Sequence, residues 1–172
     1  MSAEDRARWE ARYATGAHAG EEADPFVMKA LVHAPRGGRA LDVACGSGRH
    51  ALALARRGYA VDALDVSPTG LALARSRACG LPVRWAETDL DGASLEEGAY
   101  AVVVCVDYTD ARLVPRLLGA LAPGGLLVFV ARPRALCRFG PPPGAAARWF
   151  ATLEPLFVED GDARVLFAGR RR

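Results

Sequence analysis

Short apolar runs alternate with segments of helical length along most of the chain. Runs that suit strands, because they are apolar or rich in β-branched residues, lie at residues 40–44, 60–64, 82–86, 100–106 and 126–131. Strands that alternate with helices are typical of βαβ units, in which a parallel sheet carries helices on both faces.

Capping and turn residues set the expected helix limits. The first helix follows Gly48 and ends before Gly58. The second has Ser67 as its N-cap and ends at Gly80. Further helices are predicted at residues 110–121 and, over a shorter length, 145–153.

The C-terminal part predicts a reversed pair of strands. Two apolar runs, 156–159 and 164–168, are joined by Asp160-Gly161-Asp162, and an Asp-Gly pair between such runs indicates a hairpin. The predicted fold class is therefore α/β: a doubly wound, seven-stranded sheet that is mostly parallel, with an antiparallel C-terminal hairpin and helices on both faces.

Composition adds that the chain is a single domain without a membrane partner. It has 172 residues, of which 51% are hydrophobic and 24% charged, and its formal net charge is +2. The N-terminus is polar, and no run of 18 uncharged apolar residues follows. We expect a cytoplasmic protein, and the residues leave its oligomeric state open.

Residues that often bind metals or nucleic acids form no pattern. The four cysteines are widely spaced, so no metal site is predicted. The arginines are scattered without interleaved aromatic residues, and the run 170–172 is interpreted as a solvated tail. Nucleic acid is therefore disfavoured as a partner.

The segment from Asp42 to Gly48 lies where a strand passes into a helix. Gly46 and Gly48 lack a β-carbon, so the backbone can approach a ligand closely and adopt positive φ. The amides at the start of the helix suit an anion such as a carboxylate, and Asp42 supplies a carboxylate for an ammonium group. A ligand that carries both groups is an amino acid.

Two more acids follow the next strands. Asp65 ends the second strand, where a carboxylate can accept hydrogen bonds from ribose hydroxyls. Asp89 follows the third strand, in a position to accept from an exocyclic amine such as that of adenine. Three acids at successive strand ends match an amino acid, a ribose and a base.

These residues resemble the class I S-adenosylmethionine-dependent methyltransferases, nearest to the small-molecule enzymes of tellurite-resistance and thiopurine type. Asp42 to Gly48 resembles their glycine motif. Asp65 resembles their ribose acid, and Asp89 their adenine acid. Ala122-Pro123-Gly124-Gly125 resembles their turn before the fifth strand. Ala44 departs from the pattern, because the commonest motif has its first glycine there.

The resemblance implies S-adenosylmethionine as cofactor, a small molecule as methyl acceptor, and a division of the chain into three parts. Residues 1–30 form an N-terminal helical lid or segment, 37–131 the cofactor-binding core, and 132–172 a substrate-side loop, short helix and terminal hairpin. The cofactor-binding residues implied are Tyr13, Asp42, Ala44, Cys45, Gly46, Ser47, Gly48, Asp65, Val66, Asp89, Leu90 and Val106.

Methyl transfer from a sulfonium is an in-line displacement that depends mainly on alignment, so it does not require a dedicated base. The candidates for a catalytic role are Asp107 and Tyr108, which follow the fourth strand and could orient or deprotonate an acceptor. The alternative is that Asp107 or Asp110 caps the next helix. The segment lacks the Asn/Asp-Pro-Pro-Tyr signature of enzymes that methylate exocyclic amines of nucleic acids.

The N-terminal segment places Trp9 and Tyr13 four residues apart and hence on one helical face, with Arg12 between them. This spacing resembles the Trp-x-x-Arg-Tyr of the small-molecule methyltransferases named above, in which the segment folds over the cofactor. The alternative is an aromatic stripe that only packs the helix onto the domain.

Two rival functions use the same residues. A nicotinamide-dependent oxidoreductase would bind its cofactor at the same strand-to-helix turn, but no third glycine follows Gly48 at the required spacing. A module that holds S-adenosylmethionine or S-adenosylhomocysteine without turnover would carry every cofactor residue named above. Sequence alone leaves that alternative open.

Overall fold

The structure of the chain is a computed structural model that describes residues 3–16 and 22–172. Residues 1, 2 and 17–21, which belong to the predicted N-terminal segment, lie outside the described residues. The strands are β1 (Arg39–Val43), β2 (Ala60–Asp65), β3 (Val83–Glu87), β4 (Tyr100–Val106), β5 (Leu121–Ala131), β6 (Glu154–Asp160) and β7 (Val165–Arg170). The helices are α1 (Ala3–Ala14), α2 (Pro25–Ala30), α3 (Arg49–Arg56), α4 (Pro68–Arg77), α5 (Val114–Ala120) and α6 (Ala145–Trp149), with short 3-10 helices η1 (Leu31–His33) and η2 (Ala111–Leu113).

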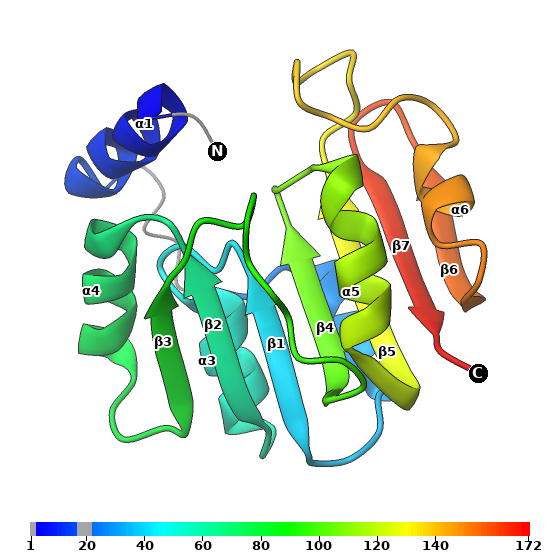
Figure 1. The fold of residues 1–172 in the computed structure, drawn as a ribbon, viewed down its shortest axis with the longest axis horizontal. Coiled ribbons are helices and arrows are strands. Elements are labelled where there is room, and N and C mark those ends of the chain that lie inside the picture. Colours follow the sequence, from blue (N-terminus) through cyan, green and yellow to red (C-terminus); the bar gives the residue numbers. More distant parts are fainter. Residues whose placement is uncertain (1–2, 17–21) are drawn as a thin grey trace.

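The strands form one sheet with helices on both faces (Figure 1). The strand order in this seven-stranded sheet is β3-β2-β1-β4-β5-β7-β6. Neighbouring strands are parallel except at β7, which runs antiparallel to β5 and β6. The predicted fold class, with its reversed C-terminal hairpin, is confirmed.

The central strands are apolar because both of their faces are buried. In β4, Val103 and Cys105 belong to the hydrophobic cluster that contains α5 and α6 residues. Val102 and Val104 belong to the cluster that contains α2 and α3 residues. Successive side chains of a strand point to opposite faces, so an uninterrupted apolar run fills both layers.

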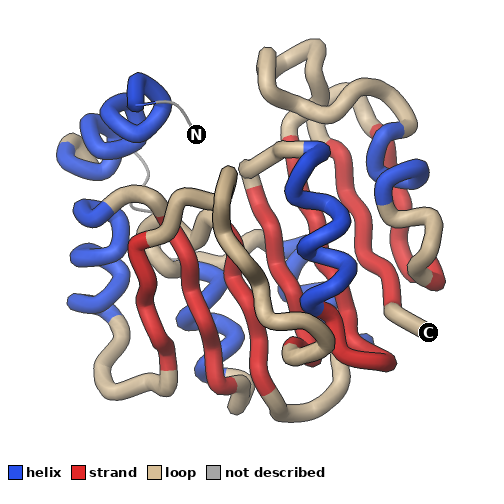
Figure 2. The backbone as a smooth tube through the Cα atoms, viewed as in Figure 1, coloured by secondary structure: helices blue, strands red, loops and turns tan. Residues whose placement is uncertain are grey.

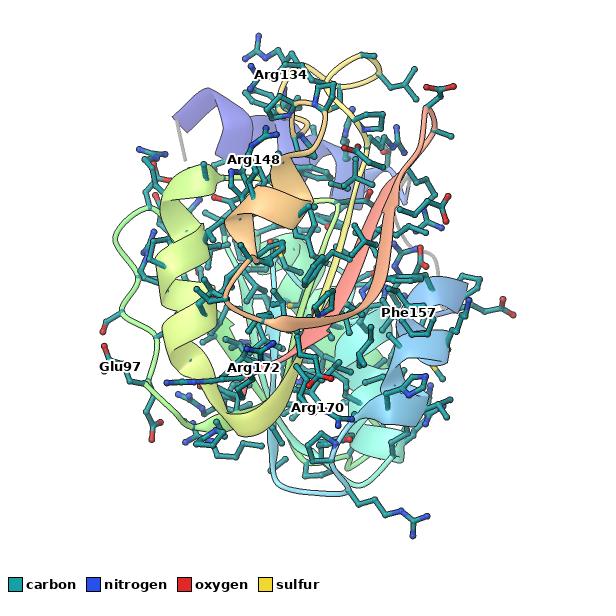
Figure 3. All side chains as sticks on the ribbon, turned by 90° about the vertical axis from the view of Figure 1, so that its right-hand side faces the viewer. Glu97, Arg134, Arg148, Phe157, Arg170 and Arg172 are labelled. Atoms are coloured by element: carbon teal, nitrogen blue, oxygen red, sulfur yellow. The ribbon has the colours of Figure 1, made fainter. Side chains whose placement is uncertain are left out.

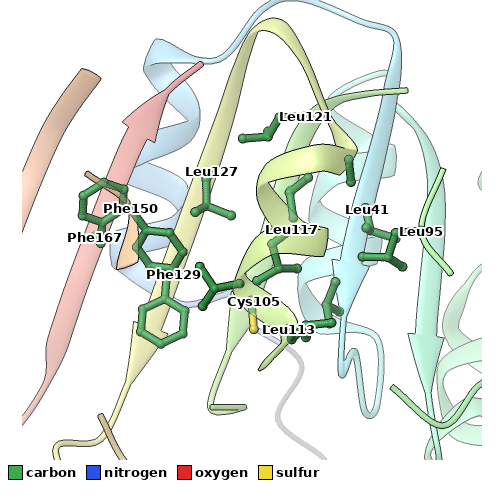
Figure 4. Packing of buried hydrophobic residues seen from close by; sticks show 14 of the residues in the cluster. Leu41, Leu95, Cys105, Leu113, Leu117, Leu121, Leu127, Phe129, Phe150 and Phe167 are labelled. Carbon is green, nitrogen blue, oxygen red and sulfur yellow. The ribbon is translucent and has the colours of Figure 1, made fainter. Parts of the chain in front are cut away.

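A row of aromatic rings joins the C-terminal strands to α6 (Figure 4). Phe129 of β5 and Phe150 have ring centroids 5.3 Å apart, and Phe150 lies 4.8 Å from Phe167 of β7. Large rings bury much apolar surface and prefer such offset or tilted contacts. Phe150 directly follows α6, so these ring contacts hold this short helix against the sheet.

The helices are shorter than the sequence predicts. The helix expected at 110–121 begins as η2, and Pro115 lies in the first turn of α5, where its missing N–H costs no hydrogen bond. The helix expected at 145–153 ends at Trp149. None of the described helices is long and apolar enough to cross a membrane.

Residues 88–99, between β3 and β4, cross the sheet as a loop rather than a helix (Figure 2). At the amino ends of the strands on this side, Asp62 accepts hydrogen bonds from Arg39 and Arg84 at 2.7 Å and from the Tyr100 hydroxyl at 2.9 Å. Burial favours the protonated form of Asp62, but these hydrogen bonds outweigh it and hold its pKa at about 2. A charged cluster thus lies at the amino ends of the strands, beside the apolar contacts that Leu90 and Leu95 of the loop make with the core.

The interpretation of residues 170–172 as a solvated tail is wrong for two of the three arginines. Arg170 ends β7 and donates to the His33 carbonyl at 2.8 Å. Arg171 donates to the Leu121 carbonyl. Figure 3 shows Arg170 and Arg172 at the end of the sheet opposite Arg134. Arg170 and Arg171 therefore bind carbonyl groups of the folded domain instead of extending into solvent.

Candidate active site

The sheet changes its winding direction between β1 and β4. From β1 the chain continues to β2 and β3 on one side, and from β4 it continues to β5 on the other. Doubly wound folds bind ligands at the carboxyl ends of the strands at such a switch point. In Figure 1, α1 and the loop of residues 132–144 lie at this edge of the sheet.

The loop between β1 and α3, residues 44–48, is called the glycine loop below. Gly46 and Gly48 have φ values of 54° and 81°, and Ala44 also adopts a positive φ of 57°. The Cys45 amide donates to the Leu64 carbonyl at 3.0 Å, which joins the loop to β2. Ala44 therefore takes the left-handed conformation that the motif's usual glycine adopts more easily.

Asp65, at the end of β2, fastens the glycine loop. Its Oδ2 accepts from the Gly46 amide and its Oδ1 from the Ser67 amide, both at 2.8 Å. Burial raises the pKa of the Asp65 carboxyl, and hydrogen bonds from these amides oppose the rise. A carboxylate has about four acceptor sites, so Asp65 keeps capacity for the hydroxyl groups of a ligand.

Asp42, in β1, is enclosed beneath the glycine loop with 1% of its surface exposed. Its Oδ2 accepts from the Ala51 amide at 2.8 Å, which ties the first turn of α3 to β1. Burial raises the pKa of Asp42 to about 8, and the nearby Asp65 carboxylate adds to the rise. The observed contact is structural, and the role toward an ammonium group stays a prediction.

Tyr13 of α1 lies over the glycine loop. A β-carbon at Gly46 would be 2.1 Å from the Tyr13 hydroxyl oxygen, and one at Gly70 would be 3.1 Å from the ring. Trp9 stacks on Tyr13 with ring centroids 6.1 Å apart, as the predicted common helical face requires. Burial, with Asp65 nearby, raises the pKa of Tyr13 well above its usual range, so the phenol stays protonated.

Polar contacts also hold α1 over this edge. Glu10 accepts a hydrogen bond from the Thr69 hydroxyl, in the first turn of α4. Arg6 pairs with Glu87, the last residue of β3. The aromatic face of α1 therefore points inward at the strand ends. This arrangement agrees with both alternatives from the sequence, a lid over the cofactor and a helix that only packs onto the domain.

The other residues expected around the cofactor lie at the same edge. Asp89 is exposed after β3, and its Oδ1 accepts from the Asp91 amide at 3.0 Å, which lowers the Asp89 pKa. The other residues expected around the cofactor are buried, with exposed fractions between 2% and 6%. They are Cys45, Ser47, Val66, Leu90 and Val106. Their contacts with a cofactor stay predictions.

Asp107 follows β4 in a left-handed conformation, φ 59°, that is uncommon for residues other than glycine. Its amide donates to the Val130 carbonyl at 2.9 Å, and its carboxylate lies 3.5 Å from Nη2 of Arg49. Asp110 is the residue that caps the next helix, because it accepts from the Arg112 amide at 2.9 Å. Asp107 is therefore not the cap.

Tyr108 is half-buried beside Asp107. Burial raises the pKa of Tyr108 well above its usual range, and Asp110 adds to this. At neutral pH the phenol is thus a hydrogen-bond donor and not a base. Arg49, which pairs with Asp107, is a candidate site residue that the sequence did not single out. Its only sequence signal was its place directly after Gly48.

His50, in the first turn of α3, has a structural contact. Its Nε2 accepts from the Asp24 amide at 3.3 Å, just before α2. Burial lowers the pKa of His50 to about 3, and the neighbouring Arg49 contributes. His50 is therefore neutral and helps to hold α2 against α3.

Below about pH 6.5 we expect the chain to lose stability through His50. The unfolded histidine binds a proton near pH 6.5 and the folded one only near pH 3, so in this window the unfolded state binds more protons. His50→Gln keeps an acceptor for Asp24 and should remove up to about 1.4 kcal/mol per pH unit from the dependence. Denaturant unfolding of both proteins at pH 7, 6, 5 and 4 measures this, and parallel pH profiles would contradict it.

A methyltransferase-domain family model matches residues 40–125, half of the chain. An uncharacterized methyltransferase of Mycobacterium tuberculosis is 36% identical over 96 residues, which cover 52% of this chain and 48% of that protein. The ubiquinone biosynthesis O-methyltransferase of Methylocella silvestris is 34% identical over 117 residues, which cover 62% and 46%. The chain thus spans about half the length of these relatives.

Solved methyltransferase structures share the fold. The N-methyltransferase NodS from Bradyrhizobium japonicum, in complex with S-adenosyl-L-homocysteine, has a TM-score of 0.78 at 19% identity, over 96% of this chain and 97% of its own. TehB from Haemophilus influenzae has a TM-score of 0.76 at 17% identity, over 95% and 67%. At these identities the likeness concerns the fold alone.

Proposed function

Because the chain belongs to the methyltransferase-domain family, we propose that it binds S-adenosylmethionine, the cofactor of these methyltransferases, and transfers its methyl group to a small-molecule acceptor. The observation that carries the proposal is the glycine loop, fastened to Asp65 and covered by Tyr13 at the switch point. The nicotinamide alternative gains no support from the family match. The binding module without turnover is the alternative that the experiment below addresses.

The residues at the switch point carry groups that match the parts of this cofactor. Gly46 has no β-carbon, so the Tyr13 hydroxyl closes on the loop backbone in the space that a β-carbon would take, and a ligand could approach the same backbone once α1 moves. Asp65 would accept hydrogen bonds from the ribose hydroxyls with its remaining lone pairs. Asp89 would accept from the adenine amine. The rest of the cofactor's surroundings would come from Asp42, Ala44, Cys45, Ser47, Gly48, Val66, Leu90 and Val106.

The charge of the site also supports a cationic cofactor. Asp42 and Asp65 are buried carboxyls, and burial raises the pKa of both. A positive charge placed nearby stabilises the ionised form of such groups. S-adenosylmethionine carries two positive groups, an ammonium and a sulfonium.

S-adenosylmethionine, when bound, supplies an electrophilic methyl group. The contribution of the chain is to align the acceptor with that methyl and to exclude water. Tyr108 would donate a hydrogen bond that orients the acceptor. Asp107 would accept a hydrogen bond or a proton from the acceptor's nucleophilic atom.

We expect α1 to act as a lid over this site. Tyr13 covers Gly46, so access to the glycine loop from that side requires α1 to move. The Arg6–Glu87 pair that helps to hold α1 is almost half exposed, and an exposed pair contributes only about 0 to 1 kcal/mol. The ion pair therefore adds little to the cost of opening, which comes mainly from the Glu10–Thr69 hydrogen bond and the packing of Tyr13 on the glycine loop.

Support for a small acceptor comes from a contact between α1 and the loop of residues 132–144. Arg8 of α1 lies 5.4 Å from the centroid of the Phe139 ring, in the 132–144 loop, so α1 and the loop meet above the strand ends. Arg138 lies 4.3 Å from the same ring. These side chains are exposed, and the contact between α1 and the loop leaves less room for a polymer than for a compact acceptor.

Transfer of a labelled methyl group from S-adenosylmethionine to a panel of phenols, thiols, amines and chalcogen oxyanions tests the proposed function. We expect methylation of at least one class. Tyr108→Phe should lower kcat about tenfold, the effect of one lost hydrogen bond to a charged or developing-charge partner. Tyr59→Phe is a matched control, because the Tyr59 hydroxyl contacts the Pro35 carbonyl away from the site.

Calorimetric titration with S-adenosylmethionine, S-adenosylhomocysteine and NAD separates the alternatives. Binding of the first two with no methylation of any acceptor supports the binding module. Binding of NAD alone supports the oxidoreductase. If the chain binds none of the three, the proposed function is wrong.

A further inference from the structure

The ion pair between Arg49 and Asp107 spans the switch point of the sheet. Arg49 begins α3, directly after the glycine loop of β1, and Asp107 directly follows β4. Because β1 and β4 are neighbours at the point where the winding direction reverses, the pair lies between the two halves of the fold. It joins the cofactor side to the acceptor side.

The geometry of the pair is that of a weak contact. The Nη2 to Oδ2 distance is 3.5 Å, longer than the 2.7 to 2.9 Å typical of charge-assisted hydrogen bonds. The Arg49 side chain is 32% exposed and that of Asp107 46%. A pair with this exposure is easily exchanged for a better partner.

Arg49 is suited to a carboxylate that reaches the glycine loop. Its guanidinium has five N–H donors in a fork that matches a carboxylate, and the contact to Asp107 uses only one nitrogen. Asp107 is held by its backbone, since its amide is bonded to Val130 in the left-handed conformation. The arginine is therefore the more adjustable member of the pair.

We propose that Arg49 recognises the carboxylate of the methyl donor and that Asp107 competes with the donor for this arginine. This inference rests on the proposed function and deepens it. Donor binding breaks the ion pair, Arg49 turns to the amino-acid carboxylate, and the Asp107 carboxylate becomes available on the acceptor side. The pair thereby links recognition of the donor to the position where the acceptor binds.

Calorimetry with two ligands isolates this contact. S-adenosylhomocysteine carries the amino-acid carboxylate, whereas 5′-methylthioadenosine shares the adenosine and thioether and lacks the amino acid. Arg49→Gln should weaken S-adenosylhomocysteine binding about tenfold or more, as the loss of a charged hydrogen bond does, and leave methylthioadenosine binding within about twofold. Arg56→Gln, at the exposed end of the same helix, should change neither.

Asp107→Asn tests the competition. Removal of the competing carboxylate should strengthen S-adenosylhomocysteine binding about two- to fivefold, the range for an exposed ion pair. In the Arg49→Gln background the same change should have no effect, because Arg49 is no longer present to be released.

The outcomes separate this inference from the proposed function. Equal weakening of both ligands by Arg49→Gln, or no weakening, overturns the inference while wild-type binding keeps the proposed function. Weaker S-adenosylhomocysteine binding in Asp107→Asn overturns the competition. A wild-type chain that binds neither ligand contradicts both proposals.

Discussion

Asp65→Ala is expected to lose both stability and cofactor affinity. The Gly46 and Ser67 amides would be left without their buried acceptor, which should lower the free energy of unfolding by about 2 to 4 kcal/mol. Affinity for S-adenosylhomocysteine should fall by about 1.5 to 3 kcal/mol, the range for a charged hydrogen bond. Denaturant unfolding and calorimetry measure the two effects separately.

Asp62→Ala is the matched control for Asp65→Ala. Asp62 lies in the same strand and also accepts several hydrogen bonds, but its partners Arg39 and Arg84 are at the amino ends of the strands. Its loss should reduce stability and leave cofactor affinity unchanged. An Asp65→Ala variant that binds S-adenosylhomocysteine as tightly as the wild type would remove Asp65 from the site.

Gly48→Ala is expected to destabilise the fold strongly. A β-carbon there would lie 2.7 Å from Cη2 of Trp85 in β3 and 2.8 Å from Cβ of Ala74 in α4. The positive φ of 81° costs a residue with a β-carbon about 1 to 2 kcal/mol, and overpacking adds about 1 to 3 kcal/mol. We expect the free energy of unfolding to fall by about 2 to 5 kcal/mol in denaturant unfolding.

Gly58→Ala separates these two costs. Gly58 also has a positive φ, 91°, but a β-carbon there would meet no atom within 4 Å. The free energy of unfolding of this variant should therefore fall only by the conformational cost of positive φ, about 1 to 2 kcal/mol. If Gly48→Ala is no less stable than Gly58→Ala, the tight contact between the glycine loop, α4 and β3 does not explain the need for glycine at position 48.

The sequence by itself determined the order of the elements and where the acids lie along the chain. The apolar run of β4 indicated burial on both faces, and the Asp-Gly pair at 160–161 indicated the reversed hairpin. Asp65 and the glycine loop came together as expected, because the carboxyl ends of parallel strands share one edge of the sheet. Such inferences succeed because periodicity and turn chemistry are local properties.

Only the tertiary structure decided which side chains meet across the strand ends. The position of Tyr13 on Gly46, the enclosure of Asp42 beneath Ala51 and the pairing of Arg49 with Asp107 join residues between nine and 58 positions apart. No local pattern encodes these contacts, because they depend on loop conformations and on how far each helix is displaced against the sheet. The sequence placed the acids at the strand ends, and packing determined what each of them contacts.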